Sequence, residues 1–328
     1  PATRVPRGSS SSKGKNTSRS RKSPFRGLRL FRYLPKNSFV YVYMDLRRLN
    51  RIPLLRPIAK GEQFPWVSEA AASLGIHLTG TQYLAASFDV RSSSTLSVHK
   101  LHQAVNRWRS ALKRPLCVVA QTKRGRGDAL RLFRKTGPLS ANMILGHRVY
   151  HKEKGFALVI PRSGLILATF RHPMANLLGL LVGRNSASAR SSDSFTLLEK
   201  MLSEAPRRPV FAVVSRPSHR RGRTSGLRVP GGGMIHASGL TVSTHSSRFN
   251  LRWKLWLDSK KNAERFIRRA KRLLENLGRL YWARKTGLAK VIKTISFKAA
   301  GKNKDVVVTE MALPHDTCKT ILDHVQSP

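Results

Sequence analysis

The chain has 328 residues, of which 62 are Lys or Arg and 16 are Asp or Glu, so its formal net charge is +46 and its isoelectric point lies near 11.8. A basic excess of this size attracts polyanions and excludes a neutral enzyme that carries one basic patch. Nucleic acid is the partner that suits such a surface best, because neutralising its phosphates releases condensed counterions. An anionic membrane or an anionic polymer of a cell envelope is the alternative.

Hydrophobic residues make up 40% of the chain, which excludes simple disorder and is enough for one large core or two ordinary ones. No apolar run reaches the roughly 20 residues that a membrane-spanning helix needs, so we expect no transmembrane segment. The two cysteines, Cys117 and Cys318, imply no disulfide framework and fit a reducing compartment.

Residues 1–32 are rich in Ser, Gly, Pro and basic residues and have almost no hydrophobic side chain before Phe25. Such a segment buries too little apolar surface to offset its ordering entropy. We therefore predict a disordered basic arm that becomes ordered on a partner. The absence of acid is also typical of a transit peptide, and the missing initiator Met suggests a processed start.

The rest of the chain alternates between strand-like and helix-like patterns, and we divide it into a domain over 33–206 and a second domain over 207–328. In the first domain, β-branched and aromatic runs predict strands, and apolar residues at helical spacing predict helices. The predicted strands are 39–46, 83–90, 116–122, 147–154 and a hairpin over 156–170; the predicted helices are 66–74, 96–112, 128–137, 173–182 and 193–205.

The second domain repeats this order of strands, helix, further strands and helix. Its clearest element is a helix over 259–278, whose apolar stripe should pack on a sheet and bury Phe266. The other predicted elements are strands 210–215, 239–246, 249–257, 291–298 and 305–311, a loop over 216–238, and a last helix over 314–325. The predicted fold class is α+β, with two similar halves that each combine an antiparallel sheet with packed helices.

A resemblance to a known family follows from several of these segments. Leu34-Pro35, the strand 39–46, Leu54-Leu55-Arg56-Pro57 and the later strands 146–150 and 165–170 resemble a two-repeat α+β domain of unknown function from bacterial envelope proteins. The likeness covers about residues 33–325. It implies two repeats, export from the cell and an ordinary charge balance, and this chain departs from the last two.

The sequence contains no catalytic or metal-binding pattern. No Gly-Lys-Ser/Thr occurs, so a phosphate-loop nucleotidase is not supported, and Gly231-Gly-Gly233 is not a dinucleotide fingerprint. The pairs His99/His102 and His147/His151 have ligand-like spacing without cysteines nearby, and no two carboxylates are paired for acid/base chemistry. We expect a non-enzymatic protein with no cofactor and no metal.

Candidate nucleic-acid-binding residues fall into three groups of cations, among which compensating acidic residues are nearly absent. A basic ridge on one helix can track phosphates, and Arg-Gly loops can bring guanidinium groups close to a nucleic-acid backbone. The arm contributes Arg4, Arg7, Lys13, Lys15, Arg19, Arg21, Lys22 and Arg26; the loops contribute Lys123, Arg124, Arg126, Arg220, Arg221 and Arg223; the helix contributes Lys261, Arg265, Arg268, Arg269 and Arg272.

These observations favour a structural RNA-binding protein of a large ribonucleoprotein, foremost an organellar or divergent ribosome. Its partners would be RNA, foremost rRNA, and neighbouring ribonucleoprotein subunits, and its compartment would be the mitochondrial matrix or another that contains ribosomes. One alternative is an exported or membrane-peripheral module of a bacterial envelope that binds anionic lipid or polymer. A nucleoid protein that packages DNA is the other. No helix-turn-helix, zinc finger or RNA-recognition signature is present.

Overall fold

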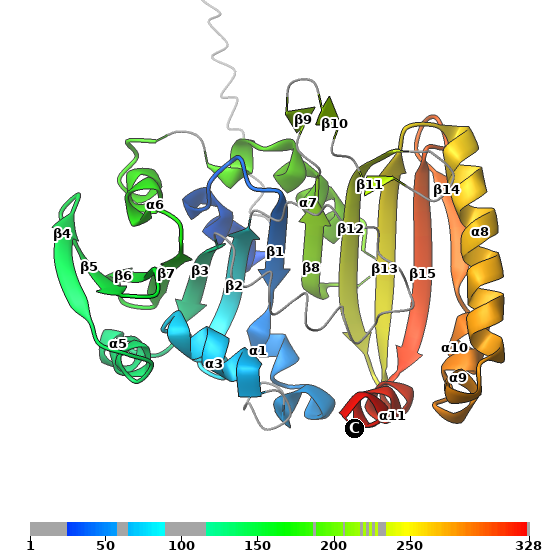
Figure 1. Cartoon of the computed structure of the whole chain (residues 1–328), viewed down its shortest axis with the longest axis horizontal. Coiled ribbons are helices and arrows are strands. Elements are labelled where there is room, and N and C mark those ends of the chain that lie inside the picture. The colour runs from blue at the N-terminus through cyan, green and yellow to red at the C-terminus, as the bar shows by residue number, and fades with distance from the viewer. Residues whose placement is uncertain are drawn as a thin grey trace, which may run out of the picture.

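The computed structural model describes residues 25–57, 65–88, 116–185, 188–205, 207–216, 219–220, 223–224, 227–228 and 234–326. The expected helix 96–112 and most of the predicted arm lie outside these residues. Within them, helices and a large antiparallel sheet confirm the α+β fold class (Figure 1).

One continuous antiparallel sheet runs through the molecule in the order β14-β15-β13-β12-β8-β1-β2-β3-β7-β6-β5-β4. In the first half its strands are β1 (Val40–Met44), β2 (Thr81–Phe88), β3 (Leu116–Thr122), β4 (Ser140–Ile144), β5 (His147–Lys152), β6 (Phe156–Arg162) and β7 (Leu165–Phe170). In the second half they are β8 (Pro209–Ser215), β12 (Met234–His245), β13 (Arg248–Leu257), β14 (Ser296–Ala300) and β15 (Val306–Pro314), and the short β11 (Leu227–Arg228) pairs with β12.

The two halves share one topology. β1, β2 and β3 form a meander, helix α5 (Arg126–Arg134) follows, and β7 returns to pair with β3. In the same way β8, β12 and β13 are followed by helix α8 (Lys260–Arg279), and β15 returns to pair with β13. The halves meet where β1 pairs with β8, so they share a single sheet. The proposed division at residue 206 therefore stays a prediction.

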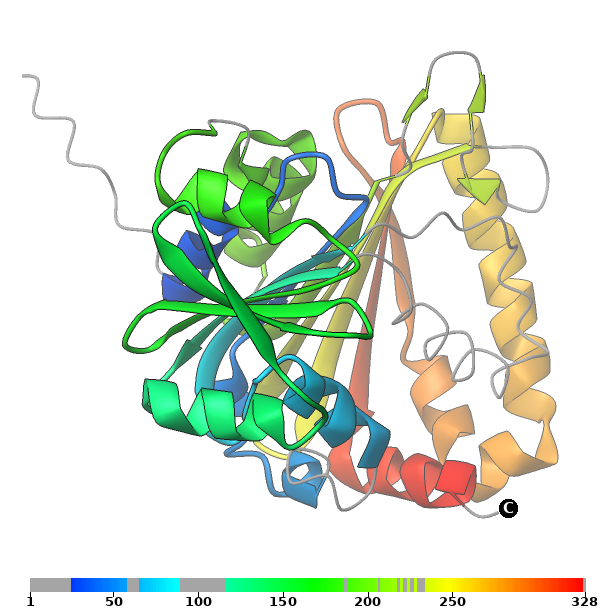
Figure 2. The same cartoon turned by 60° about the vertical axis from the view of Figure 1, so that its left-hand side comes forward.

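Helices cover both faces of the first half of the sheet (Figure 2). On one face, α6 (Met174–Leu181) and α7 (Asp193–Ser203) pack with the 3₁₀ helix η1 (Arg26–Tyr33) over Tyr41 and Tyr43. On the other face, α3 (Pro65–Ser73) and α5 lie over Val118 and Ile166. This explains the nearly continuous apolar runs of β3 and β7, because both faces of these strands are buried.

Helix η1 corrects the predicted extent of the arm. Phe25, Leu28, Leu30 and Phe31 are buried in the core, so residues 25–32 belong to the folded body. The packing is close: a Cβ on Gly27 would lie 2.7 Å from Cε2 of Tyr43. The four apolar side chains supply the burial that the earlier part of the arm lacks.

In the second half, α8 lies over one face of the sheet. Ser259 caps the helix by accepting a hydrogen bond from the backbone N–H of Asn262 at 3.3 Å. Ala263 is buried against Leu255 and Val307, and the ring of Phe266 meets Trp253 edge to face at 6.1 Å. Phe266 is half-buried, not fully buried as expected, because α8 lies along the outer strands and leaves Trp253 exposed on one side.

Three further elements differ from the sequence expectations. Residues 291–295 were expected to begin a strand, but α10 (Leu288–Lys293) follows α9 (Tyr281–Lys285) there, and β14 begins at Ser296. Strand β4 was not expected; it is short, its residues are mostly exposed, and it forms an edge of the sheet. The expected loop 216–238 contains the small hairpin of β9 (His219–Arg220) and β10 (Arg223–Thr224).

The remaining elements are short connections and a terminal helix. Helix α1 (Leu46–Leu49) follows β1 and is capped by buried Asp45, which accepts a hydrogen bond from the backbone N–H of Arg48 at 3.2 Å. Helix α11 (His315–Gln326) follows β15 directly. The two other 3₁₀ turns are η2 (Pro53–Leu55) and η4 (Ala189–Ser191).

Candidate nucleic-acid interface

The predicted basic ridge is present on α8. Lys261, Arg265, Arg268, Arg269 and Arg272 are all exposed, on the side of the helix away from the sheet. Glu264, an acid of the same helix, pairs with Lys260 at 3.8 Å. Among the residues that the structure describes, none of the five ridge cations has an ion pair. We call these five residues the α8 ridge.

The other predicted residues do not join the α8 ridge in one site. Lys123, Arg124 and Arg126 are exposed at the turn into α5, at one end of the first half, and Nη2 of Arg126 donates to the Tyr150 hydroxyl at 3.3 Å. Arg220 and Arg223 lie in the β9–β10 hairpin, at the opposite end of the molecule (Figures 1 and 2). The cations are therefore spread over several sides of the body.

Of the predicted cations of the arm, Arg26 is the one within the described residues. Arg26 is exposed on η1, whose apolar side chains are buried. Arg221 and the earlier members of the arm fall outside the described part of the chain: Arg4, Arg7, Lys13, Lys15, Arg19, Arg21 and Lys22.

A basic surface that the sequence did not predict lies on the face of the second half opposite α8. Side chains alternate between the two faces of a strand, so Arg248, Asn250, Arg252 and Lys254 of β13 point to this face while Leu255 and Leu257 point to α8. We call it the polar face. Among the described residues it is covered by a helix only at its inner edge, where Met201 of α7 lies over Gly239.

Strand register builds the polar face from opposing pairs. Thr241 lies opposite Arg252, Ser243 opposite Asn250, and His245 opposite Arg248. On the far side of β13, Glu310 of β15 lies opposite Arg252. These pairs bring polar side chains of three strands together on one surface.

Two carboxylates on the polar face are held by particular cations. Glu310 Oε1 lies 3.1 Å from Nε of Arg252. Glu204, just after α7, forms an ion pair with the buried Lys254 ammonium, and its carbonyl accepts from Arg252 at 2.5 Å. Burial by itself would raise the pKa of Glu204. The hydrogen bond and charge of Lys254 outweigh this effect, together with the charges of Lys200 and Arg252, so the pKa of Glu204 lies below 4.5.

The Glu204 to Gln substitution should lower the free energy of unfolding by about 1 to 3 kcal/mol at pH 7, because it leaves the buried Lys254 ammonium without its carboxylate. Because the folded pKa of Glu204 is depressed, its stabilisation is present above pH 4.5 and is lost as pH falls through the folded pKa. The difference between wild type and variant should therefore shrink towards pH 2.5. Urea unfolding at both pH values measures it.

The matched control is Glu199→Gln, an exposed carboxylate of the same helix with no ion pair among the described residues. It should change stability little at either pH. Equal losses in the two variants at pH 7 would show that the Lys254 pair does not stabilise the fold.

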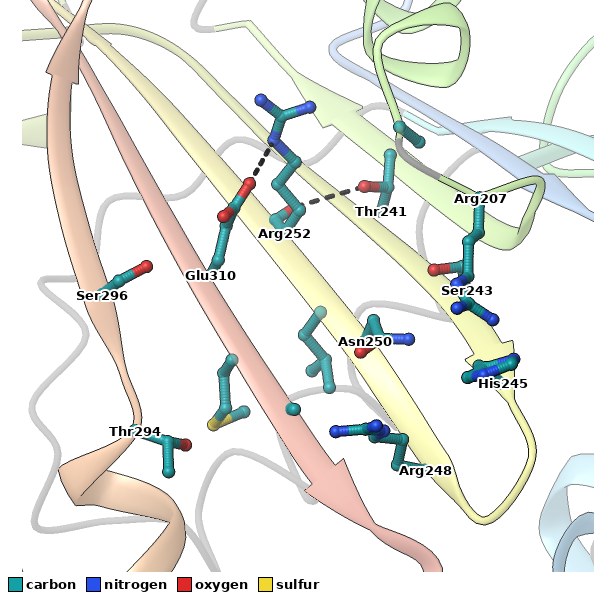
Figure 3. Close-up of a pocket in the computed structure, with 14 residues that line it drawn as sticks. Arg207, Thr241, Ser243, His245, Arg248, Asn250, Arg252, Thr294, Ser296 and Glu310 are labelled. Carbon is teal, nitrogen blue, oxygen red and sulfur yellow. Dashed lines mark hydrogen bonds and ion pairs between the residues drawn. The ribbon is translucent and has the colours of Figure 1, made fainter.

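The polar face is hollowed near the turn between β12 and β13. A cavity of about 360 Å³ lies there, and Figure 3 shows its polar lining. Arg207, from the segment between α7 and β8, extends over Ser243 towards His245, and Arg248 and Asn250 lie below (Figure 3). In the part of the chain that the structure describes, neither Arg207 nor Arg248 has an ion pair.

No cluster of His, Cys, Asp or Glu that could hold a metal ion occurs among the described residues. His151 instead hydrogen-bonds Asn142 Oδ1 at 2.7 Å, while His99 and His102 lie outside them. Cys117 is buried, and burial raises the pKa of its thiol to about 12. None of the helices described is both long enough and apolar enough to cross a membrane.

Comparison with known proteins gives information on the fold. No family model and no curated protein matches the chain. Crystal forms III and IV of TP0453, a bacterial envelope-associated protein, match with TM-scores of 0.51 and 0.50, each at 12% identity. The match covers 91% of this chain and 98% of that chain for form III, and 89% and 95% for form IV. This agrees with the predicted resemblance at the level of the fold.

Proposed function

We propose that this protein is a non-enzymatic RNA-binding component of a large ribonucleoprotein particle, foremost an organellar or divergent ribosome. The observation that carries the proposal is the α8 ridge, whose five exposed cations have no acidic partner in the described structure. A surface with this much uncompensated charge releases counterions when it meets phosphates, and that release drives binding.

The geometry of the ridge suits a phosphate backbone. Lys261, Arg265, Arg268 and Arg272 follow one another at three- and four-residue spacing, so they form a row along one side of α8. The rise of a helix makes this row about 16 Å long. A row of cations without base-reading side chains positions a nucleic acid and does not read its sequence.

The spread of charge favours folded RNA over a single duplex. The turn into α5, the α8 ridge and the polar face lie on different sides of the body. A protein that binds one straight duplex needs one such surface, whereas a protein embedded in folded RNA meets phosphates on several sides. Neighbouring subunits and rRNA are the partners that this arrangement suits.

A second candidate is an anionic membrane surface, as in a membrane-peripheral envelope module. Leu273, Leu280 and Tyr281 are exposed at the end of α8 and the start of α9, beside Arg279 and Arg284. Exposed apolar side chains next to cations are typical of a helix that lies in a lipid interface.

The deciding experiment titrates the full chain with a folded RNA, a DNA duplex and vesicles of anionic lipid over a range of salt. RNA should bind with a log–log salt slope of several units, about 0.7 to 0.9 per neutralised phosphate, and more tightly than the duplex. Co-sedimentation of the native protein with ribosomal particles would place it in a ribosome. Tighter binding to vesicles at matched charge would favour the membrane, and preference for the duplex would favour DNA packaging.

A further inference from the structure

The cavity of the polar face has the lining of an anion site, and it is separate from the α8 ridge because the two lie on opposite faces of the sheet. Its cations come from two elements. Arg248 stands on β13, and Arg207 stands on the segment that leads into β8. Figure 3 shows both among polar side chains of β12 and β13.

The strand register places the titratable and cationic groups side by side. His245 and Arg248 are directly opposite across the two-residue turn of Ser246 and Ser247, so their Cβ atoms are close neighbours. Like charges in such a pair repel when the imidazole is protonated. An anion bound between the two groups would attract both and so offset this repulsion.

The nearby acids are engaged with other cations. Glu310 is paired with Arg252, and Glu204 is paired with Lys254 and Lys200. Among the described residues no carboxylate pairs with Arg207 or Arg248. Because the acidic side chains near the cavity are ion-paired with other cations, Arg207 and Arg248 are available to bind an anion from outside the chain.

The donors indicate which anion. Guanidinium groups offer paired N–H donors that match the oxygens of a phosphate, and they bind it more directionally than an ammonium does. Ser243, Asn250, Thr294 and Ser296 add neutral hydroxyl and amide donors around the same cavity. Several donors from different directions suit a tetrahedral oxyanion better than a planar carboxylate.

We infer that the cavity lined by Arg207, His245 and Arg248 binds a phosphate group. Two sources of that group share this chemistry: a phosphate of RNA, and a small phosphorylated molecule. The inference goes beyond the proposed function, because the site would bind phosphate whether or not the α8 ridge binds RNA.

The test uses the full chain and inorganic phosphate, with binding measured by calorimetry at constant ionic strength. Wild type should bind one phosphate, and Arg207→Gln and Arg248→Gln should each weaken that binding by about tenfold or more, since each removes a charge-assisted hydrogen bond. The control Arg131→Gln removes one positive charge from an exposed position of α5 that has no part in the proposed binding surfaces, and should leave the affinity unchanged. Circular dichroism of each variant verifies that the fold is retained.

Two further titrations identify the source of the phosphate. Ribose 5-phosphate, with ribose as its blank, probes a small ligand, and a folded RNA probes the backbone. If Arg248→Gln weakens the binding of both ligands, the group is an RNA phosphate. If it weakens the binding of ribose 5-phosphate alone, the ligand is a small molecule, and either result supports the site.

No phosphate binding by wild type, equal binding by all variants, or equal affinity for acetate would overturn the inference. A failure of RNA binding in Arg265→Gln alone would concern the α8 ridge and leave this site intact.

Discussion

Replacing Phe31 with alanine should lower the free energy of unfolding by about 3 to 5 kcal/mol. The ring is fully buried, 6.1 Å from the ring of Tyr41 and 5.3 Å from that of Phe195. It joins η1 to both the sheet and α7, so its loss leaves a cavity between three elements. Reversible urea unfolding followed by tryptophan fluorescence measures the effect.

The control for this prediction is Arg29→Ala, an exposed residue of the same 3₁₀ helix. Its effect should stay within about 0.5 kcal/mol. A Phe31→Ala variant as stable as wild type would mean that residues 25–32 belong to the arm, as the sequence predicts, and not to the core.

Changing Arg265, Arg268 and Arg272 together to Gln should weaken RNA binding strongly and reduce the salt slope by about three, one for each lost phosphate contact. Stability should hardly change, because these exposed charges lie in a field of like charge and have no ion pairs within the described structure. Fluorescence anisotropy with a folded RNA, over a salt series, measures both the affinity and the slope.

The matched control removes the same charge from another helix. Arg131, Arg134 and Lys135 are exposed on and just after α5, and changing all three to Gln lowers the net charge equally. If the α8 ridge is the contact surface, this control should retain most of the salt slope. Equal losses in both triple variants would show that net charge alone governs binding, and an α8 variant that binds RNA normally but unfolds would assign these arginines to the fold.

Much of the fold could be predicted from local pattern. Apolar runs such as that of β3 and the helical spacing from Ala263 to Leu277 depend on neighbours in the sequence, so they were identified with small errors at the ends. Helix η1 was missed because its apolar residues are only four and follow a long basic segment. The first part of the strand expected over 291–298 was wrong because Val291 and Ile292, which have strand propensity, are in α10, and β14 begins only at Ser296.

The candidate sites, like the fold, could be predicted from the sequence only in part. The α8 ridge could be found because its cations recur at helical spacing within one element. The cavity of the polar face could not, because Arg207, Arg248 and Glu310 lie far apart in the sequence, and the pairing of β13 with β15 and the path of the chain into β8 bring them together. The available signal was the alternation of polar and apolar residues along β13. This alternation predicts one polar face and one apolar face for the strand, but it does not identify the residues of the neighbouring strands.

The pairing of β1 with β8 has a consequence for how the protein is made. β1 is translated early, and β8 follows only after the whole first half, so one edge of the growing sheet stays open while the intervening residues are synthesised. An open edge of unpaired backbone groups can recruit a strand from another chain. We expect the basic excess of the first half to keep nascent chains apart by mutual repulsion until β8 pairs with β1, so the same charge would oppose aggregation during synthesis.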